Sequence, residues 1–227
     1  MTDGDGSRDL LILGAAGGWA LTAAELAEGS GWHVRGLVNN LPPGEVRLPD
    51  CPYPIWQLAE LPPDLLALPA FCCLTTPQYR RRLVDEATAC GLKAFARLIH
   101  PSAQILPSAV LGVGSYVGTV CSVVTRASLG NHVFLLNGVL VGHNGRIDDF
   151  ATIGPGAIIS SRCHIREGAF VGPAATVLPR VTVGTDSVVA AGSVVTRDVP
   201  DQCLVAGAPA VIKREGYPGY RGLDERA

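Results

Sequence analysis

Aliphatic residues recur at every sixth position through the second half of this 227-residue chain. From Ile99 to Val195 each sixth residue is valine, isoleucine or leucine, which gives seventeen in a row. The residue four places after each of them, from Ala103 to Val199, is glycine, alanine, serine, cysteine or valine. A period of six matches neither the 3.6-residue period of an α-helix nor the alternation of a simple β-strand.

This pattern predicts a parallel β-helix with a triangular cross-section. Each hexad forms one short strand and one turn, three hexads close a coil, and the aliphatic side chain points into the prism. The small residue lies near a corner, where a larger side chain does not fit, so Cys121 and Cys163 are interpreted as packing residues. One coil cannot bury its own apolar face, and successive coils therefore have to stack.

The N-terminal part shows a different pattern. An apolar strand at residues 10–13, a glycine-rich turn, a helix and a second strand at 33–38 form a βαβ opening, which is typical of a Rossmann-like α/β domain. A glycine-rich turn can hold phosphate on the amides of the helix that follows, but a tight turn needs glycine in any case. Phosphate contact is therefore a hypothesis for the turn residues Gly14, Ala15, Ala16, Gly17 and Gly18.

These two patterns predict two domains and a tail. The α/β domain covers residues 1–96, the β-helix covers residues 97–212, and residues 213–227 form a loose end or a short cap. Prolines in the segment 197–214 are expected to stop strand pairing at the end of the β-helix.

The composition argues against several classes of protein. The formal net charge is −2 with no long run of one sign, which disfavours a protein that binds nucleic acid or a membrane surface. No apolar run is long enough to span a bilayer, and the N-terminus lacks the pattern of a signal peptide. The seven cysteines form no CxxC pair, so we expect a cytoplasmic protein with free thiols and no bound metal.

Short motifs mark the start, middle and end of the repeats. They are LIHPSA at residues 98–103, VGH at 141–143, AAGSVVTRDVP at 190–200 and GAPAVIKR at 207–214. With the glycine-rich N-terminal domain, they make nearly the whole chain resemble the hexapeptide-repeat sugar acyltransferases. The similar group contains the bacillosamine-type UDP-amino-sugar N-acetyltransferases and the sialic acid O-acetyltransferases. The resemblance implies a left-handed coil, a homotrimer with acetyl-CoA between neighbouring subunits, and an N-terminal domain that binds the nucleotide of the acceptor.

His143 is the candidate general base. It is third in its hexad and is expected to project outward from a corner. Imidazole has an ordinary pKa near 6.5, so a neutral ring can accept the proton that an amine or hydroxyl loses as it attacks a thioester. The resemblance implies this role in a direct transfer, with the backbone amide of Ser161, 18 residues later, stabilising the oxyanion. The alternative is a surface histidine in a subunit contact.

Some positions near the base depart from the family pattern. Many relatives have an acidic residue where this chain has Asn144, whose amide can orient the His143 ring but cannot stabilise imidazolium as a carboxylate does. Asp148 and Asp149 either compensate for this change or are solvated corner residues. Some relatives also have a second histidine where this chain has Thr152.

Other departures concern the acceptor. Relatives often have histidine where this chain has Gly18, and acidic residues where it has Asn39 and Asn40. Because these are candidate substrate-binding positions, the identity of the nucleotide and of the sugar stays open. Asn137, six residues before the histidine, either reaches the acceptor or is a corner asparagine that tolerates a turn conformation. Coenzyme A is expected at the closing coils, where small residues permit close approach and basic residues suit phosphate. These candidates are Ala191, Gly192, Gly207, Ala208, Lys213 and Arg214.

The sequence therefore predicts an acetyl-CoA-dependent N-acetyltransferase that acts on the amino group of a nucleotide-linked sugar. O-acetylation of a sugar hydroxyl is a close alternative, because His143 can serve either acceptor. A β-helix carbonic anhydrase would need three histidines on one zinc ion, for which the prism offers His132, His143 and His164. The last alternative is a non-catalytic homologue that binds a nucleotide sugar.

Overall fold

The computed structural model describes residues 8–15, 19–39, 41–42, 48 and 50–220, and contacts divide the chain into two units. The α/β unit comprises the chain up to Leu74 together with Arg82–Leu98. The β-helix unit comprises Thr75–Arg81 together with the chain from Ile99 onward. This division differs from a single boundary after residue 96, because residues 75–81 make their contacts with the β-helix.

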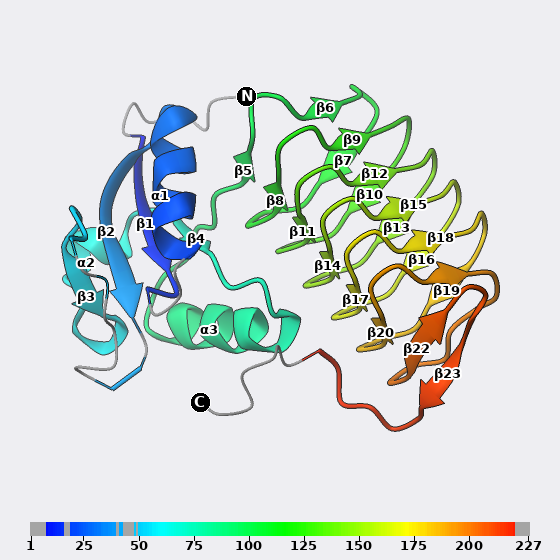
Figure 1. Ribbon diagram of the computed structural model, residues 1–227. Coiled ribbons are helices and arrows are strands. Elements are labelled where there is room, and N and C mark those ends of the chain that lie inside the picture. The colour runs from blue at the N-terminus through cyan, green and yellow to red at the C-terminus, as the bar shows by residue number, and fades with distance from the viewer. Residues whose placement is uncertain (1–7, 16–18, 40, 43–47, 49, 221–227) are drawn as a thin grey trace. The chain divides into compact units, whose positions relative to one another are not determined.

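A parallel sheet in the order β3-β2-β1-β4 forms the centre of the α/β unit (Figure 1). Strand β1 lies inside this sheet, and its apolar run Leu10–Leu13 is completely buried, as expected for a parallel strand covered on both faces. Helix α1 buries its alanines, which are the small residues that allow close packing on a sheet. The elements are β1 (Asp9–Leu13), α1 (Trp19–Gly29), β2 (His33–Asn39), β3 (Ile55–Gln57), a 3₁₀ turn (Leu58–Glu60), α2 (Pro63–Leu66), β4 (Ala70–Cys72) and α3 (Pro77–Ala89).

The order of these elements confirms the predicted βαβ opening. Helix α3 begins within the β-helix unit and continues in the α/β unit. Within the described residues, no helix is both long enough and apolar enough to cross a membrane.

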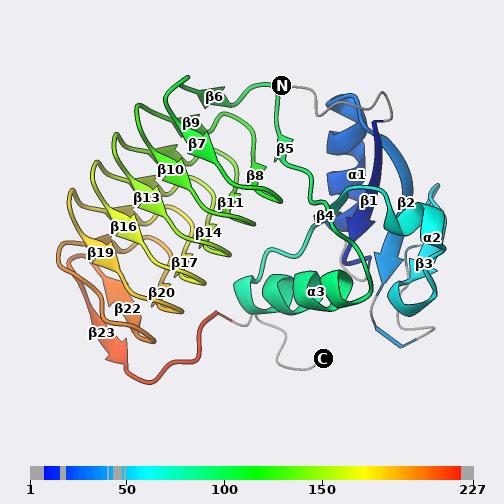
Figure 2. The same ribbon diagram turned by 180° about the vertical axis from the view of Figure 1, so that it is seen from behind.

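Short strands in three sheets build the β-helix unit, and Figures 1 and 2 show its stacked coils from two sides. Sheet B contains β5 (Leu98–Ile99), β8 (Tyr116–Val117), β11 (Phe134–Leu135), β14 (Thr152–Ile153), β17 (Phe170–Val171), β20 (Val188–Val189), β22 (Leu204–Gly207) and β23 (Ala210–Arg214). Sheet C contains β6 (Gln104–Ile105), β9 (Ser122–Val123), β12 (Leu140–Val141), β15 (Ile158–Ile159), β18 (Thr176–Val177) and β21 (Val194–Val195). Sheet D contains β7 (Val110–Leu111), β10 (Ser128–Leu129), β13 (Arg146–Ile147), β16 (His164–Ile165) and β19 (Thr182–Val183).

The core of the β-helix follows the six-residue pattern. The second residue of each two-residue strand points inward, and these residues form one apolar cluster with the small residues of the turns. Cys121 and Cys163 are each 1% exposed in this cluster, and their thiols donate hydrogen bonds to the carbonyls of Leu136 and Leu178, both at 3.0 Å. Burial raises the pKa of both thiols, which keeps them protonated. Their prediction as packing residues is confirmed.

Turns of successive coils stack into three corners. The Asn137 corner joins sheet B to sheet C and comprises residues 100–103, 118–121, 136–139, 154–157, 172–175 and 190–193. The His143 corner joins sheet C to sheet D and comprises residues 106–109, 124–127, 142–145, 160–163, 178–181 and 196–198.

The end of the β-helix differs from the prediction. Strand pairing does not stop at the prolines, because β22 continues sheet B in parallel with β20 and β23 pairs with β22 antiparallel. The tail is not a loose end over its described residues. The ring of Tyr220 stacks on Phe170 with centroids 3.7 Å apart, and the carbonyl of Pro218 accepts a hydrogen bond from Gln78.

A buried arginine ties residues 75–81 to the coils. Arg80 is completely buried, and its guanidinium donates to the carbonyls of His132 (2.9 Å) and Phe150 (2.7 Å) and to the hydroxyl of Thr152 (2.9 Å). The same guanidinium lies 4.1 Å from the centroid of the Phe134 ring. Thr152, the position of a second histidine in some relatives, is therefore part of this packing.

Acidification is expected to weaken the β-helix unit through His132. Its ring is 5% exposed and stacks on Phe150, and burial, reinforced by the charge of Arg80, lowers its pKa to about 4. The unfolded chain has the ordinary value near 6.5 and binds the proton first, so this contribution to stability is complete above about pH 6.5 and is lost as the pH falls toward 4. The loss reaches about 3 kcal/mol.

The variant His132→Asn isolates this effect, because asparagine does not titrate and tolerates the left-handed backbone at this position (φ 53°). Free energies of unfolding measured between pH 4 and pH 7 should fall less steeply in this variant than in the wild type. The His100→Asn variant, at a partly exposed histidine, is the control. An unchanged slope in His132→Asn would show that the buried ring does not carry the effect.

Candidate active site

His143 stands exposed on a turn of the β-helix. It follows strand β12 and lies in the turn 142–145 of the His143 corner, as its place in the hexad predicts. The only polar side-chain contact of its ring among the described residues is with Asn144, whose Nδ2 lies 2.8 Å from Nδ1. Asn144 has a φ of 53°, a left-handed conformation that asparagine tolerates well.

The amide of Asn144 can hold either tautomer of the His143 ring. With Nδ2 donating, Nδ1 is the acceptor and the ring proton is on Nε2. With the amide reversed, Oδ1 accepts from Nδ1–H and leaves a lone pair on Nε2, which is the form a general base needs. A carboxylate would permit only the second arrangement, whereas an amide permits both.

Neither nearby aspartate replaces the missing carboxylate. Asp148 accepts from Arg146 Nε at 2.6 Å and lies 2.6 Å from His164 Nε2. Asp149 accepts from the backbone and side-chain nitrogens of Asn131 at 2.8 and 3.4 Å. Both carboxylates therefore have partners on other turns and strands, and neither contacts the ring of His143 in this chain.

Ser161 stacks directly on His143 in the next coil. The hydrogen bond from Arg162 N to His143 O, 3.0 Å long, holds the two turns together. The two turns can stack this closely because residue 142 is a glycine, since a Cβ on Gly142 would lie 2.6 Å from Ser161 N. Among the described residues the amide of Ser161 has no hydrogen-bond acceptor. An amide of this kind can donate to an oxyanion.

The predicted coenzyme residues gather on the Asn137 corner. Asn137 itself has a structural contact, since its Oδ1 accepts from Thr119 N at 3.2 Å. Three coils further on, the amide of Ala191 has no acceptor among the described residues, and a Cβ on Gly192 would meet no atom within 4 Å. A Cβ on Gly156 would also meet no atom within 4 Å. The sequence analysis did not single out this glycine, although its spacing of 18 residues from Gly138 places it on the same corner.

The remaining coenzyme candidates lie on the closing hairpin. Gly207 and Ala208 follow the same corner onto the end of β22, where the amide of Gly207 donates to Ser193 Oγ at 3.2 Å. Lys213 and Arg214 are exposed on β23, and the Arg214 guanidinium lies 5.5 Å from the Tyr217 ring.

One chain does not bring all these residues together. Asn137 and Gly192 lie on one corner, His143 and Ser161 lie on the next, and the width of sheet C separates the two corners. Sheet C also exposes apolar side chains between them, with Leu140 41% and Ile158 43% exposed.

The glycine-rich turn of the α/β unit is only partly described. Gly14 is left-handed (φ 101°), and its amide and that of Ala15 both donate to the carbonyl of Val38, at 2.9 and 3.2 Å. These contacts favour the structural explanation of the turn, whereas Ala16, Gly17 and Gly18 lie outside the described residues. Asn39 is 1% exposed and binds the backbone of Leu41 through both atoms of its amide, while Asn40 lies outside the described residues.

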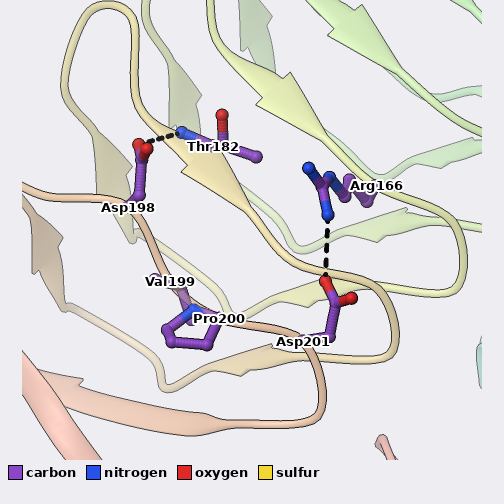
Figure 3. A pocket seen from close by; sticks show the side chains of 6 residues that line it. All are labelled: Arg166, Thr182, Asp198, Val199, Pro200 and Asp201. Carbon is purple, nitrogen blue, oxygen red and sulfur yellow. Dashed lines mark hydrogen bonds and ion pairs between the residues drawn. The ribbon is translucent and has the colours of Figure 1, made fainter.

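A hollow of about 300 Å³ lies at the end of sheet D, away from the candidate residues (Figure 3). It forms because the last coil is short: Val199 pairs with Val183, 16 rather than 18 positions earlier. Its polar groups satisfy one another, with Asp198 accepting from Thr182 N at 2.8 Å and Arg166 donating to Asp201 at 3.3 Å.

The histidines of the prism do not form a metal centre. His132 is buried, His143 stands at a corner, and His164 pairs with Asp148 on sheet D. In the described part of the chain, no three His, Cys, Asp or Glu side chains are placed to hold one metal ion. The three histidines therefore do not converge within one chain.

Comparison with known proteins supports the fold and the class. A family model described as bacterial transferase hexapeptide (six repeats) matches residues 162–197. The chain is 32% identical over 126 residues to bifunctional protein GlmU of Sorangium cellulosum and 36% identical over 118 residues to serine acetyltransferase 2 of Arabidopsis thaliana. These alignments cover 52% and 51% of this chain but only 25% and 32% of those proteins. The chain thus spans about a third or less of these curated relatives.

Three solved structures match nearly end to end. PerB from Caulobacter crescentus, in complex with CoA and GDP-perosamine, is 30% identical with a TM-score of 0.80, and 91% of this chain covers 97% of it. The acetyltransferase domain of PglB from Neisseria gonorrhoeae, in complex with acetyl coenzyme A, is 30% identical with a TM-score of 0.78 and is covered completely. A histidine variant of perosamine N-acetyltransferase from Caulobacter crescentus, also with CoA and GDP-perosamine, has a TM-score of 0.82 at 29% identity. These matches confirm the predicted α/β domain followed by a left-handed β-helix.

Replacing Asn144 by aspartate tests the contact between its amide and the ring. A carboxylate at this position can only accept from Nδ1–H, so we expect the neutral His143 ring in Asn144→Asp to carry its proton on Nδ1, as followed by ¹⁵N NMR of the ring. Asn137→Asp makes the same charge change at the other corner and should leave the ring nitrogen signals unchanged. A neutral ring in Asn144→Asp with its proton on Nε2 would contradict the contact.

Proposed function

Because this chain belongs to the hexapeptide-repeat sugar acetyltransferases, we propose that it transfers the acetyl group of acetyl-CoA to an amino group of a nucleotide-linked sugar. The observation that carries the proposal is the end-to-end likeness of both units to PerB, which was solved with CoA and GDP-perosamine. The curated relatives align with only about half of the chain. They therefore support the transfer of an acyl group but not the identity of the acceptor.

His143 acts as the general base in this proposal. The acceptor nitrogen attacks the thioester carbonyl and forms the new N–C bond, and His143 Nε2, in the tautomer with the ring proton on Nδ1, takes the proton that the nitrogen loses. The free amide of Ser161 donates to the oxyanion of the tetrahedral intermediate. When the C–S bond breaks, the imidazolium returns the proton to the leaving thiolate, so the products are the amide and the free thiol of CoA.

The proposal needs no covalent enzyme intermediate. Cys121, Cys163 and Cys203 are buried in the β-helix, and burial raises the pKa of each thiol. A protonated thiol inside the core is a poor nucleophile. Direct attack of the acceptor on acetyl-CoA is therefore the simpler route.

Neighbouring subunits complete the site in this proposal. Sheet C separates the His143 corner from the Asn137 corner, so a cleft lined by both requires two chains. In a homotrimer of parallel prisms, the base of one chain faces the small residues of the next, and the exposed Leu140 and Ile158 of sheet C supply apolar surface for packing. Gly156 and Gly192 present no side chain there, which permits close approach of the pantetheine arm.

Loss of the base should abolish turnover without abolishing binding. We expect His143→Gln to lower kcat by about 10²- to 10⁴-fold, which is the usual contribution of general base catalysis. The assay measures release of the CoA thiol with UDP- and GDP-linked amino sugars, and the variant His100→Gln, at a partly exposed histidine, is the control. Full activity in His143→Gln would overturn the mechanism.

The same assay separates the alternatives. A wild-type protein that binds CoA and a nucleotide sugar but transfers nothing would be the non-catalytic homologue. Transfer only to sugars that carry a hydroxyl in place of the amine would identify an O-acetyltransferase.

Mixing two inactive variants tests the shared site. His143→Gln removes the base, and Ala191→Trp blocks the Asn137 corner at an exposed position whose backbone is not left-handed. Co-refolded in equal amounts, the two chains should regain activity, since roughly a quarter of the interfaces in random trimers join an intact base to an intact corner. Sites contained within one chain would show no recovery.

A further inference from the structure

The arginines of the β-helix unit fall into two groups. Those in the first group have partners: Arg80 donates to carbonyls, Arg81 pairs with Glu167 at 3.0 Å, Arg146 pairs with Asp148, Arg166 pairs with Asp201, and Arg214 lies over Tyr217. The second group is Arg126, Arg162, Arg180 and Arg197, which are exposed and form no ion pair with any described residue.

All four unpaired arginines lie on the His143 corner. Arg126, Arg162 and Arg180 occupy the same place in their turns as Asn144, with left-handed φ angles of 55°, 61° and 67°. Backbone hydrogen bonds stack these turns, with Arg162 N donating to His143 O at 3.0 Å and Arg180 N donating to Ser161 O at 3.1 Å. Arg197 lies in the shortened turn of the last coil. We call these four residues the arginine edge.

The charges of the arginine edge are uncompensated. Successive coils are spaced by about 4.8 Å, the distance between paired strands, so the guanidinium groups repel one another along the edge. The carboxylate of Asp198 lies in the same turn as Arg197, but it accepts a hydrogen bond from the backbone of Thr182. The whole chain has a net charge of −2, so basic residues are not in general excess. The concentration of four unpaired arginines on one edge therefore indicates a surface that binds an anion.

We infer that the arginine edge binds the phosphate groups of acetyl-CoA. This inference rests on the proposed function. Guanidinium groups match the planar, multidentate geometry of phosphate oxygens. The thioester has to reach His143, and three of the four arginines continue from that residue toward the closing coils. Arg197 belongs to the same coil as Ala191 and Gly192, so parallel neighbouring prisms bring these residues to the same level.

The diphosphate of the nucleotide-linked acceptor is the other source of the same chemistry. Only Arg126 lies on the opposite side of His143 from the closing coils. The experiment therefore compares the two ligands directly, and it uses Arg180 and Arg197, which lie furthest from the base.

Calorimetry with the complete protein tests the inference. We expect the double variant Arg180→Gln, Arg197→Gln to bind CoA about 10-fold or more weakly than the wild type, because hydrogen bonds to charged groups are lost. Its affinity for acetyl-pantetheine, which carries no phosphate, and for UDP- or GDP-sugars should stay unchanged. The dependence of CoA affinity on salt concentration should also become shallower. The matched control is the double variant Arg146→Gln, Arg166→Gln, which removes two paired arginines, one in β13 and one directly after β16.

Each contrary result has a distinct meaning. Wild-type affinity for CoA in the Arg180→Gln, Arg197→Gln variant would overturn the inference and leave the proposed function intact. Weaker binding of the nucleotide sugar alone would overturn it in favour of the acceptor diphosphate. Equal loss in the Arg146→Gln, Arg166→Gln control would show an effect of net charge and not of the edge. A wild-type protein that binds no CoA would refute the proposed function together with the inference.

Discussion

The register between coils is the constraint on which the rest of this structure depends. Each strand pairs with residues 18 positions away, so the amides of one coil find the carbonyls of the next, as between Val141 and Ile159. The same register stacks aliphatic residues inward and keeps the turns aligned at the corners. A turn residue therefore has a fixed height and a fixed direction. This is how an exposed histidine acquires a defined position on a fold that has no long loops in its coils.

The distribution of functional groups over two corners makes the proposed chemistry a property of the assembly. Small residues with open space and a free amide lie on the Asn137 corner, and the candidate base lies on the His143 corner. The apolar side chains of sheet C fill the face between them. In the proposed homotrimer, the surface that separates the two halves within a chain joins them between chains, and the arginine edge extends the basic half along the proposed cleft.

Features that depend on sequence period alone could be predicted, whereas features that depend on tertiary contacts could not. The period of six predicted the inward residues, the packed Cys121 and Cys163, and the exposure of His143. It could not predict Arg80, because the partners of that buried side chain are mainly backbone carbonyls, which leave no mark on residue type. The ordered tail depends on the contact between Tyr220 and Phe170, which no local pattern encodes. The arginine edge was readable, since Arg126, Arg162 and Arg180 are separated by multiples of 18.

The shortened final coil shows how this fold can change over evolutionary time. A deletion of two residues shortens the spacing between paired residues from 18 to 16, as for Val183 with Val199 and Val189 with Val205, and every coil that spans the deletion has to close over the shorter turn. Here the deletion precedes only the closing hairpin. The carboxylate of Asp198 accepts the hydrogen bond of Thr182 N, whereas one coil earlier the equivalent His164 N donates to the backbone carbonyl of Val181. Insertions and deletions are therefore tolerated near the end of the column, or in steps of a full turn of the spiral. New substrate preferences within the prism have to arise by exchanging side chains at existing corners.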